Sequence, residues 1–375
     1  MKIGIITYWD TKDNYGQLLQ CYALQTFLRK MGHEAFLIRY KSKPVTKPQF
    51  QWRKILNYII KFPTYISLFF DITNRSIKIK KYGRYVNENN IRNFESFRAK
   101  HITATEKIYS EQELYNIPPK ADAYICGSDQ IWGGDPIYYL PFAPTRSKKI
   151  AYAPSFGGVR QMDSKYELKI KKYLSSFCFV GVREQSGVEL CHQIGIEKAV
   201  KVVDPTMLLP LDDYNKIRKK ASFTKPYIFL YLLGNPIAYS VSLIYKFAKK
   251  HNFNVIYVAS QGRLDSYKKA FPEIGEWIDY LANADFIVTN SFHCTVFSLL
   301  YGKKFATIPL TKGFKRMNVR IDDLLTESRL TSTILQHGNT LDKIYHTNFD
   351  FSHFEEYRKR EIQKTYNYLY KSLVP

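Results

Sequence analysis

Short apolar segments alternate with amphipathic ones along most of the chain, and this alternation constrains the fold most strongly. Residues 3–7 are an apolar strand candidate, and residues 8–15 form a polar loop. A helix is expected over 17–31, where apolar side chains recur at helical spacing, followed by a second strand at 35–38. We interpret Gly16 as giving backbone freedom at the turn. Repeated strand–helix–strand units predict a parallel sheet covered by helices on both faces.

The same rhythm continues through the second half of the chain, which indicates two domains. We expect two Rossmann-like domains that face each other across a cleft, over residues 1–205 and 206–335, with a helical C-terminal tail over 336–375. Further strands are expected at 123–126, 150–153, 179–182, 200–203, 227–232, 255–258, 286–288 and 305–308. Further helices are expected near 239–250, 275–283, 293–301 and 351–373.

Residues 41–118 break this rhythm and are interpreted as a mostly helical, basic insertion in the first domain. Residues 41–84 carry eleven Lys or Arg and one Asp, a net charge of +10, interleaved with aromatic side chains. Such a segment can be a solvated basic face, a surface that contacts an anionic membrane, or a nucleic-acid binding region. Because no known nucleic-acid binding pattern accompanies it, we expect no nucleic-acid partner, and peripheral contact with an anionic membrane stays open.

Composition excludes several classes of protein. The chain has 375 residues and a net charge of +23, with 45% hydrophobic residues, which is unlike a disordered chain. Its five cysteines form no CxxC pair, so we expect reduced thiols and no structural zinc. The apolar run at the N-terminus is too short for a signal peptide, and no stretch is long enough for a membrane span. A cytoplasmic protein is the expectation.

Four turns that follow predicted strands, or enter predicted helices, carry reactive side chains. Ligands in parallel sheets bind at such turns. His293 stands at the start of a predicted helix, where it is a candidate general acid or base, or a packed histidine. Arg183 can hold a carboxylate or phosphate, or pair with its neighbour Glu184. Asp129 is a candidate base or a helix cap, and the loop 13–17 either caps a helix or contacts a hydroxylated acceptor.

The segment from Phe286 to Ile321 contains no Asp or Glu but several Lys and Arg. Without carboxylates to neutralise them, these cations suit a multiply charged anion. The supporting cations that we single out in this segment are Lys312, Arg316 and Arg320. The chain lacks GxGxxG after the first strand, and it lacks P-loop, HExxH and GxSxG motifs. A dinucleotide cofactor, a P-loop enzyme, a zinc protease and an α/β-hydrolase are therefore unsupported.

Six motifs, taken in order, resemble the polysaccharide pyruvyl transferase family over roughly residues 1–325. They are Asn14–Gln25 within the first unit, Gly127–Trp132, Ala153–Gly157, Val182–Ser186, Val203–Thr206 and Asn290–His293. The resemblance implies two Rossmann-like domains of the GT-B kind. It also implies transfer of the enolpyruvyl group of phosphoenolpyruvate to a sugar of a surface polysaccharide or its lipid-linked precursor. The products are a pyruvate ketal and phosphate, with no cofactor or metal.

The resemblance also implies roles for individual residues. Arg183 matches an arginine that holds phosphoenolpyruvate, and His293 matches a histidine close to the same ligand. Many members carry an arginine two residues before that histidine, whereas this chain has Ser291 there. A cation from Lys312, Lys315, Arg316 or Arg320 therefore substitutes, or the donor binds differently. Asp129 is the expected base on the acceptor side, and acceptor contacts are expected from Asn14, Tyr15, Gln17 and Trp132.

Two other functions fit parts of the pattern. One is a GT-B glycosyltransferase that uses a nucleotide sugar, which commonly needs an acidic residue in the second domain. The acid-free segment 286–321 argues against it. The other is a non-catalytic relative that binds a polymer or a membrane, which Ser291 and the basic insertion keep open.

Overall fold

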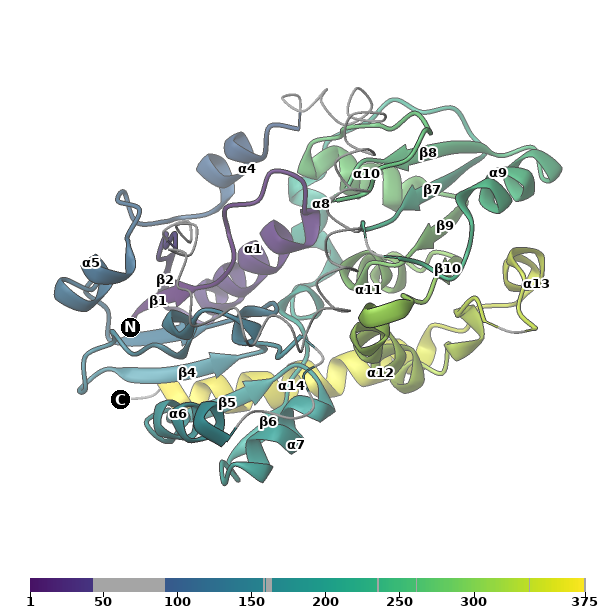
Figure 1. The fold of residues 1–375 in the computed structure, drawn as a ribbon. Coiled ribbons are helices and arrows are strands. Elements are labelled where there is room, and N and C mark those ends of the chain that lie inside the picture. The colour runs from purple at the N-terminus through teal and green to yellow at the C-terminus, as the bar shows by residue number, and fades with distance from the viewer. Residues whose placement is uncertain are drawn as a thin grey trace, which may run out of the picture.

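Two parallel β-sheets, each covered by helices, make up the protein (Figure 1). The computed structural model describes residues 1–42, 92–157, 159, 164–234, 236–260, 262–336 and 338–373. The predicted α/β class with two Rossmann-like domains is confirmed by the two sheets. All ten predicted strands are present, because their apolar residues are buried in a sheet that has helices on both faces.

The first sheet has six parallel strands in the order β2-β1-β3-β4-β5-β6. Its strand order reverses at β1, so the ends of β1 and β3 form the place where such sheets bind ligands. The strands are β1 (Lys2–Ile6), β2 (Glu34–Leu37), β3 (Ala123–Cys126), β4 (Lys148–Tyr152), β5 (Phe179–Val182) and β6 (Ala199–Lys201). The helices between them are α1 (Tyr15–Lys30), α4 (Phe94–His101), α5 (Glu111–Asn116), α6 (Ser164–Ser175) and α7 (Gln185–Gln193).

The second sheet has four parallel strands in the order β10-β9-β7-β8, with its reversal between β7 and β9. The strands are β7 (Tyr227–Tyr231), β8 (Asn254–Val258), β9 (Phe286–Thr289) and β10 (Phe305–Thr307). Its helices are α8 (Leu211–Ile217), α9 (Val241–Lys250), α10 (Ile274–Asn283), α11 (Phe292–Leu300), α12 (Val319–Glu327) and α13 (Leu341–His346).

The helix α1 joins the two domains through a continuous apolar core. Tyr15, at its first turn, stacks on Trp277 of α10 with ring centroids 5.4 Å apart. Its hydroxyl donates a 2.7 Å hydrogen bond to the carbonyl of Pro272. At the other end of the helix, Lys30 forms a 2.5 Å ion pair with the buried carboxylate of Asp213. Both ends of α1 are therefore packed against the second domain.

The chain crosses between the domains twice. After β6 it enters the second domain through a short 3-10 helix, Pro205–Met207. The C-terminal helix α14 (Ser352–Leu373) then returns beneath both domains to the first sheet, as Figure 1 shows. There, Tyr368 packs on Phe179 of β5 with ring centroids 4.0 Å apart. Two Rossmann-like domains joined by a returning C-terminal helix form a GT-B-like arrangement, as predicted.

The prediction of a helical basic insertion is not confirmed. Residues 43–91, which include most of the basic segment 41–84, lie outside the described residues. The described remainder contains the short helices α4 and α5. Between them, backbone hydrogen bonds join Leu37 to residues 103 and 105 and join residues 39 and 41 to Tyr109. Since this part runs alongside the chain that continues β2, it extends the edge of the first sheet.

In the parts of the chain that the structure describes, every helix is too short or too polar to pass through a lipid bilayer.

Candidate active site

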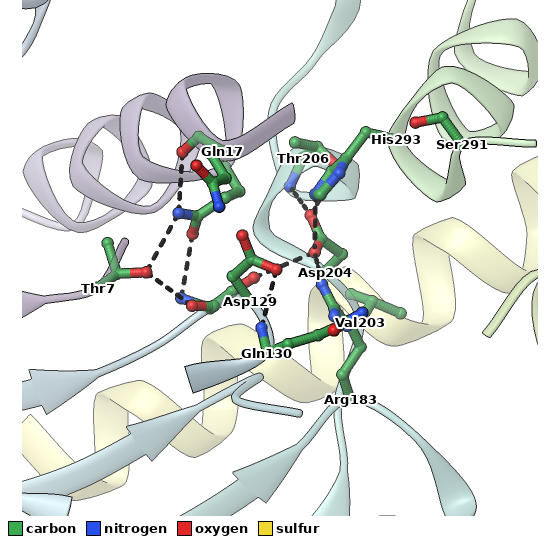
Figure 2. A network of polar contacts seen from close by, with 12 residues as sticks. Thr7, Gln17, Asp129, Gln130, Arg183, Val203, Asp204, Thr206, Ser291 and His293 are labelled. Atoms are coloured by element: carbon green, nitrogen blue, oxygen red, sulfur yellow. Dashed lines mark hydrogen bonds and ion pairs between the residues drawn. The ribbon is translucent and has the colours of Figure 1, made fainter. Parts of the chain in front are cut away.

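The loops that follow β1, β3, β5 and β9 meet where the two sheets point their carboxyl ends at each other. A carboxylate, Asp204, lies at the centre of this meeting point (Figure 2). Asp204 caps the 3-10 helix at the crossing, because one oxygen, Oδ1, accepts hydrogen bonds from the backbone N–H and the hydroxyl of Thr206 at 3.0 and 2.7 Å. Its other oxygen, Oδ2, therefore remains for the side chains around it.

Three side chains from three different turns converge on Oδ2 of Asp204. Nη1 of Arg183 donates to it at 2.9 Å, and the hydroxyl of Ser128 donates at 3.1 Å. Nε2 of His293 lies 3.5 Å away. Arg183 follows β5, Ser128 follows β3 and His293 is in the first turn of α11, so this one carboxylate links both domains.

Asp204 is ionised in this setting. Burial alone would raise its pKa, but His293, Arg183 and the N–H of Thr206 together hold the pKa well below the ordinary value. The pKa of Arg183 is in turn raised: its burial acts against the charge, but the carboxylates of Glu184 and Asp204 outweigh it. Arg183 is thus a permanently charged group that is already committed to two carboxylates.

Polar atoms without a hydrogen bond remain on both of the predicted donor-binding residues, although Nε2 of His293 keeps its 3.5 Å contact with Asp204. Arg183 uses Nε on Glu184 at 3.2 Å and Nη1 on Asp204, while its Nη2 is buried without a hydrogen bond. Nε2 of His293 is likewise buried without one. Buried donors are rarely left unpaired, so an anion with several oxygens would satisfy atoms that this structure leaves open.

The ring of His293 lies against the backbone of Gly16. A Cβ built on Gly16 would come within 2.2 Å of Nδ1 of that ring. The backbone conformation of Gly16 is ordinary for α1, so the interpretation that this glycine frees a turn is wrong. Its function is to permit close approach, which places His293 at the N-termini of both α1 and α11 (Figure 2). Two helix N-termini favour a negative charge at this point.

Arg320 completes the site from the second domain. Its guanidinium lies 5.8 Å from the ring centroid of Phe292, and that of Arg183 lies 5.1 Å from the same centroid. With the Gln130 side-chain amide turned over, its oxygen accepts hydrogen bonds from Nη1 and Nη2 of Arg320 at 2.9 and 2.7 Å. Burial and the charge of Arg183 lower the pKa of Arg320 to about 10. A bound anion would relieve this unfavourable environment.

A narrow crevice runs between these groups, and both domains line it. Its walls include Arg183 and Glu184 from the first domain and Phe292, Arg320 and Asp323 from the second. Asp129 lies beside this region, 7% exposed, and one of its carboxylate oxygens accepts a 2.8 Å hydrogen bond from the N–H of Gln130. Its second oxygen has no hydrogen bond among the described residues, which leaves it able to accept a proton.

The residues predicted to contact the acceptor are dispersed. Asn14 caps α1 by accepting from the N–H of Gln17, and Gln17 is partly exposed at the first turn. Tyr15 is fully buried in the core between the domains. Trp132 is 1% exposed and stacks on Tyr139 at 5.0 Å, and its N–H donates to the carbonyl of Tyr138. Neither Tyr15 nor Trp132 is open to a ligand, so the structure brings only Asn14 and Gln17 near the site.

The structure also brings only some of the predicted supporting cations to the site. Lys312 and Arg316 are exposed on the 3-10 helix Lys312–Asn318, and neither lines the crevice. Arg320, the second residue of the following helix α12, lines the crevice. Of the three, it is therefore the one that the fold places beside Arg183.

The comparisons with known proteins identify the family. The family model described as polysaccharide pyruvyl transferase matches residues 14–310, which is most of the chain. The chain belongs to the polysaccharide pyruvyl transferase family. No curated protein matches its sequence.

The solved structures that resemble this chain have low sequence identity to it and modest TM-scores. UDP-GlcNAc 2-epimerase from Methanocaldococcus jannaschii is 11% identical, over 92% of this chain and 90% of that one, with a TM-score of 0.49. Alr3699/HepE from Anabaena, in complex with UDP and glucose, is 10% identical over 99% and 100%, with a TM-score of 0.47. UDP-GlcNAc 2-epimerase from Neisseria meningitidis is 10% identical over 97% and 93%, with a TM-score of 0.45.

Ser291 occupies the position where many members of the family carry an arginine. It is 4% exposed and caps α11 by accepting from the N–H of Cys294 at 3.4 Å. Its side chain therefore serves the helix and supplies no charge. Among the four cations named as candidates to replace that arginine, Arg320 is the one that lines the crevice beside Arg183.

Asp204, the centre of the site, was not among the residues predicted from the sequence. Asp204 stands in the motif Val203–Thr206, but an Asp before a Pro is also an ordinary cap of a short helix. Ser128, adjacent to the predicted Asp129, was given no role, whereas the alternative that Arg183 pairs with Glu184 is confirmed by their 3.2 Å contact. The available signal was position, since Asp204 and Ser128 each follow or closely follow a predicted strand end.

Proposed function

We propose that this protein is a phosphoenolpyruvate-dependent pyruvyltransferase that forms a pyruvate ketal on a sugar and releases phosphate. One observation carries the proposal. Arg183 and Arg320 line one crevice, and Nη2 of Arg183 is buried there without a hydrogen bond. His293 shares the carboxylate of Asp204 with Arg183 and lies beside the N-termini of two helices. This is an arrangement for a small ligand with both a carboxylate and a phosphate.

The two arginines have different tasks in this proposal. Arg183 is balanced by Glu184 and Asp204, and its Nη2 has no hydrogen bond, so it orients phosphoenolpyruvate more than it attracts it. Arg320 has an uncharged partner, Gln130, and no ion pair with a described residue. Arg320 therefore supplies most of the uncompensated positive charge for the donor.

The proposed reaction begins with proton transfer from His293 to the methylene carbon of the donor. The central carbon then acquires oxocarbenium character, and a sugar hydroxyl attacks it while Asp129 takes the hydroxyl proton. A second hydroxyl of the same sugar displaces phosphate and its proton leaves with the phosphate. The arginines stabilise the charge on the phosphate as it departs. No cofactor or metal takes part.

A direct assay tests this function. Purified protein is mixed with phosphoenolpyruvate and sugar acceptors, and phosphate release and the mass of the acceptor are measured. His293→Ala is expected to abolish both while the circular dichroism spectrum stays that of the wild type. His346→Ala, which changes an exposed histidine in the same domain, is the matched control. Near-normal turnover by His293→Ala would contradict the assignment.

Ligand-dependent thermal stability separates this proposal from a nucleotide-sugar glycosyltransferase. Phosphoenolpyruvate is expected to raise the melting temperature, because it pairs with charges that are otherwise unpaired. A panel of nucleotide sugars is expected to leave it unchanged. The reverse result would favour the glycosyltransferase. A cytoplasmic location, with the acceptor on a lipid carrier at the inner membrane face, completes the proposal.

A further inference from the structure

A groove of about 390 Å³ lies between α7 of the first domain and α12 of the second. It adjoins the crevice of the candidate active site, because Asp323 lines both. Asp323 is one helical turn after Arg320, so the two side chains are neighbours on one face of α12. On the other side, α7 begins at Gln185, two residues after Arg183.

The wall that α7 contributes is a polar stripe. Gln185, Glu189 and Gln193 recur at a spacing of four residues and are exposed. In the part of the chain that the structure describes, none of these three side chains has a hydrogen bond or an ion pair. Their amide and carboxylate groups are thus available as both donors and acceptors.

The groove differs in charge from the rest of the protein. The chain carries a net charge of +23, yet no Lys or Arg lines this groove, whereas Glu189 and Asp323 do. A phosphate or a nucleotide would meet two carboxylates with no lining cation. Leu190, which is buried, and Val319, which is half-buried, add apolar surface beside the polar stripe. Uncharged sugars fit this combination, because they offer hydroxyls to amides and carboxylates and C–H faces to apolar side chains.

We propose that this groove binds the uncharged saccharide of the acceptor and leads its reacting hydroxyls to the crevice. The acceptor role rests on the proposed function, whereas binding of a neutral saccharide in the groove can be measured separately. This location replaces the acceptor contacts expected from Tyr15 and Trp132, which are both buried.

Two variants test the groove. Gln193→Trp fills it and Glu189→Lys inverts its charge, and both positions are exposed, so folding should be preserved. Gln363→Trp, on the exposed face of α14, is the matched control. Saturation-transfer NMR is recorded with cellotriose, chitotriose and a galactose-containing trisaccharide, and separately with uronic-acid and sugar-diphosphate probes.

We expect the wild type and Gln363→Trp to give signals with a neutral trisaccharide, and both groove variants to lose them at least fivefold. Phosphoenolpyruvate is expected to raise the melting temperature of all four proteins equally. Unchanged saccharide signals in the groove variants, or wild-type binding of acidic probes alone, would overturn the inference. If the saccharide result holds but phosphoenolpyruvate fails to bind the wild type, the groove stands and the proposed reaction fails.

Discussion

At the residue scale, the absence of a side chain on Gly16 lets the ring of His293 lie against the first turn of α1. Gly16→Ala is expected to displace that ring, because the new Cβ would stand 2.2 Å from Nδ1. The substitution itself should stabilise α1, because Ala is favoured over Gly by about 1 kcal/mol in a helix. We therefore expect a folded protein with at least tenfold lower turnover, measured as phosphate release. Gly313→Ala is the control, because a Cβ there meets no atom within 4 Å. Equal activity in both variants would contradict this role.

A second residue-scale prediction concerns the uncompensated charge of Arg320. Arg320→Gln keeps a hydrogen-bonding side chain but removes the cation, and charge-assisted hydrogen bonds contribute about 1.5–3 kcal/mol. The KM for phosphoenolpyruvate is therefore expected to rise by about 10- to 100-fold, with a smaller change in kcat. Arg316→Gln, which alters an exposed arginine four residues earlier, should leave the KM near the wild-type value. If both substitutions raise the KM for phosphoenolpyruvate equally, the effect comes from the overall positive charge of this region and not from direct contact between Arg320 and phosphoenolpyruvate.

At the scale of elements, α14 secures the segment that crosses between the domains. Arg358 of α14 donates hydrogen bonds to the carbonyls of Met207 and Leu209 at 2.8 and 2.6 Å. Arg358→Ala is expected to lower the free energy of unfolding by about 2–3 kcal/mol, because both carbonyls lose a charged donor. Arg360→Ala removes an arginine that is 55% exposed on the same helix, and it should cost less than about 1 kcal/mol. Urea denaturation measures both. Equal losses would mean that the two carbonyl contacts do not stabilise the crossing.

The elements themselves could be predicted largely from the sequence, because each strand is a short apolar run and each major helix has a clear apolar stripe. The helix expected over 293–301 is present as Phe292–Leu300, and the tail helix expected over 351–373 as Ser352–Leu373. The helices α6, α7, α8, α12 and α13 escaped prediction. The shortest of them, α8 and α13, have too few residues for an apolar period to show. The positions of Arg183 and His293 just after predicted strands likewise indicated that they belong to the site. Their meeting at Asp204 depends on how the two domains approach, which no local pattern encodes.

At the scale of the whole molecule, Asp204 connects the domains through partners on both sides, so its ionisation bears on global stability. Asp204→Asn keeps the shape but leaves Arg183 without one of its carboxylates, and breaking a buried pair costs about 3–5 kcal/mol. The folded-state pKa of Asp204 is depressed, so its contribution is fully present above the ordinary pKa of an aspartate. That contribution is lost only as pH falls through the lower, folded-state value. We expect the stability difference between the two proteins to be constant from pH 8 to pH 5 and to shrink only below about pH 4. Urea denaturation of the wild type and Asp204→Asn at each pH measures this difference. If the stability difference already shrinks between pH 7 and pH 5, the folded protein raises the pKa of Asp204. In that case the Asp204 carboxylate is not the ionised group that links Arg183 to the second domain.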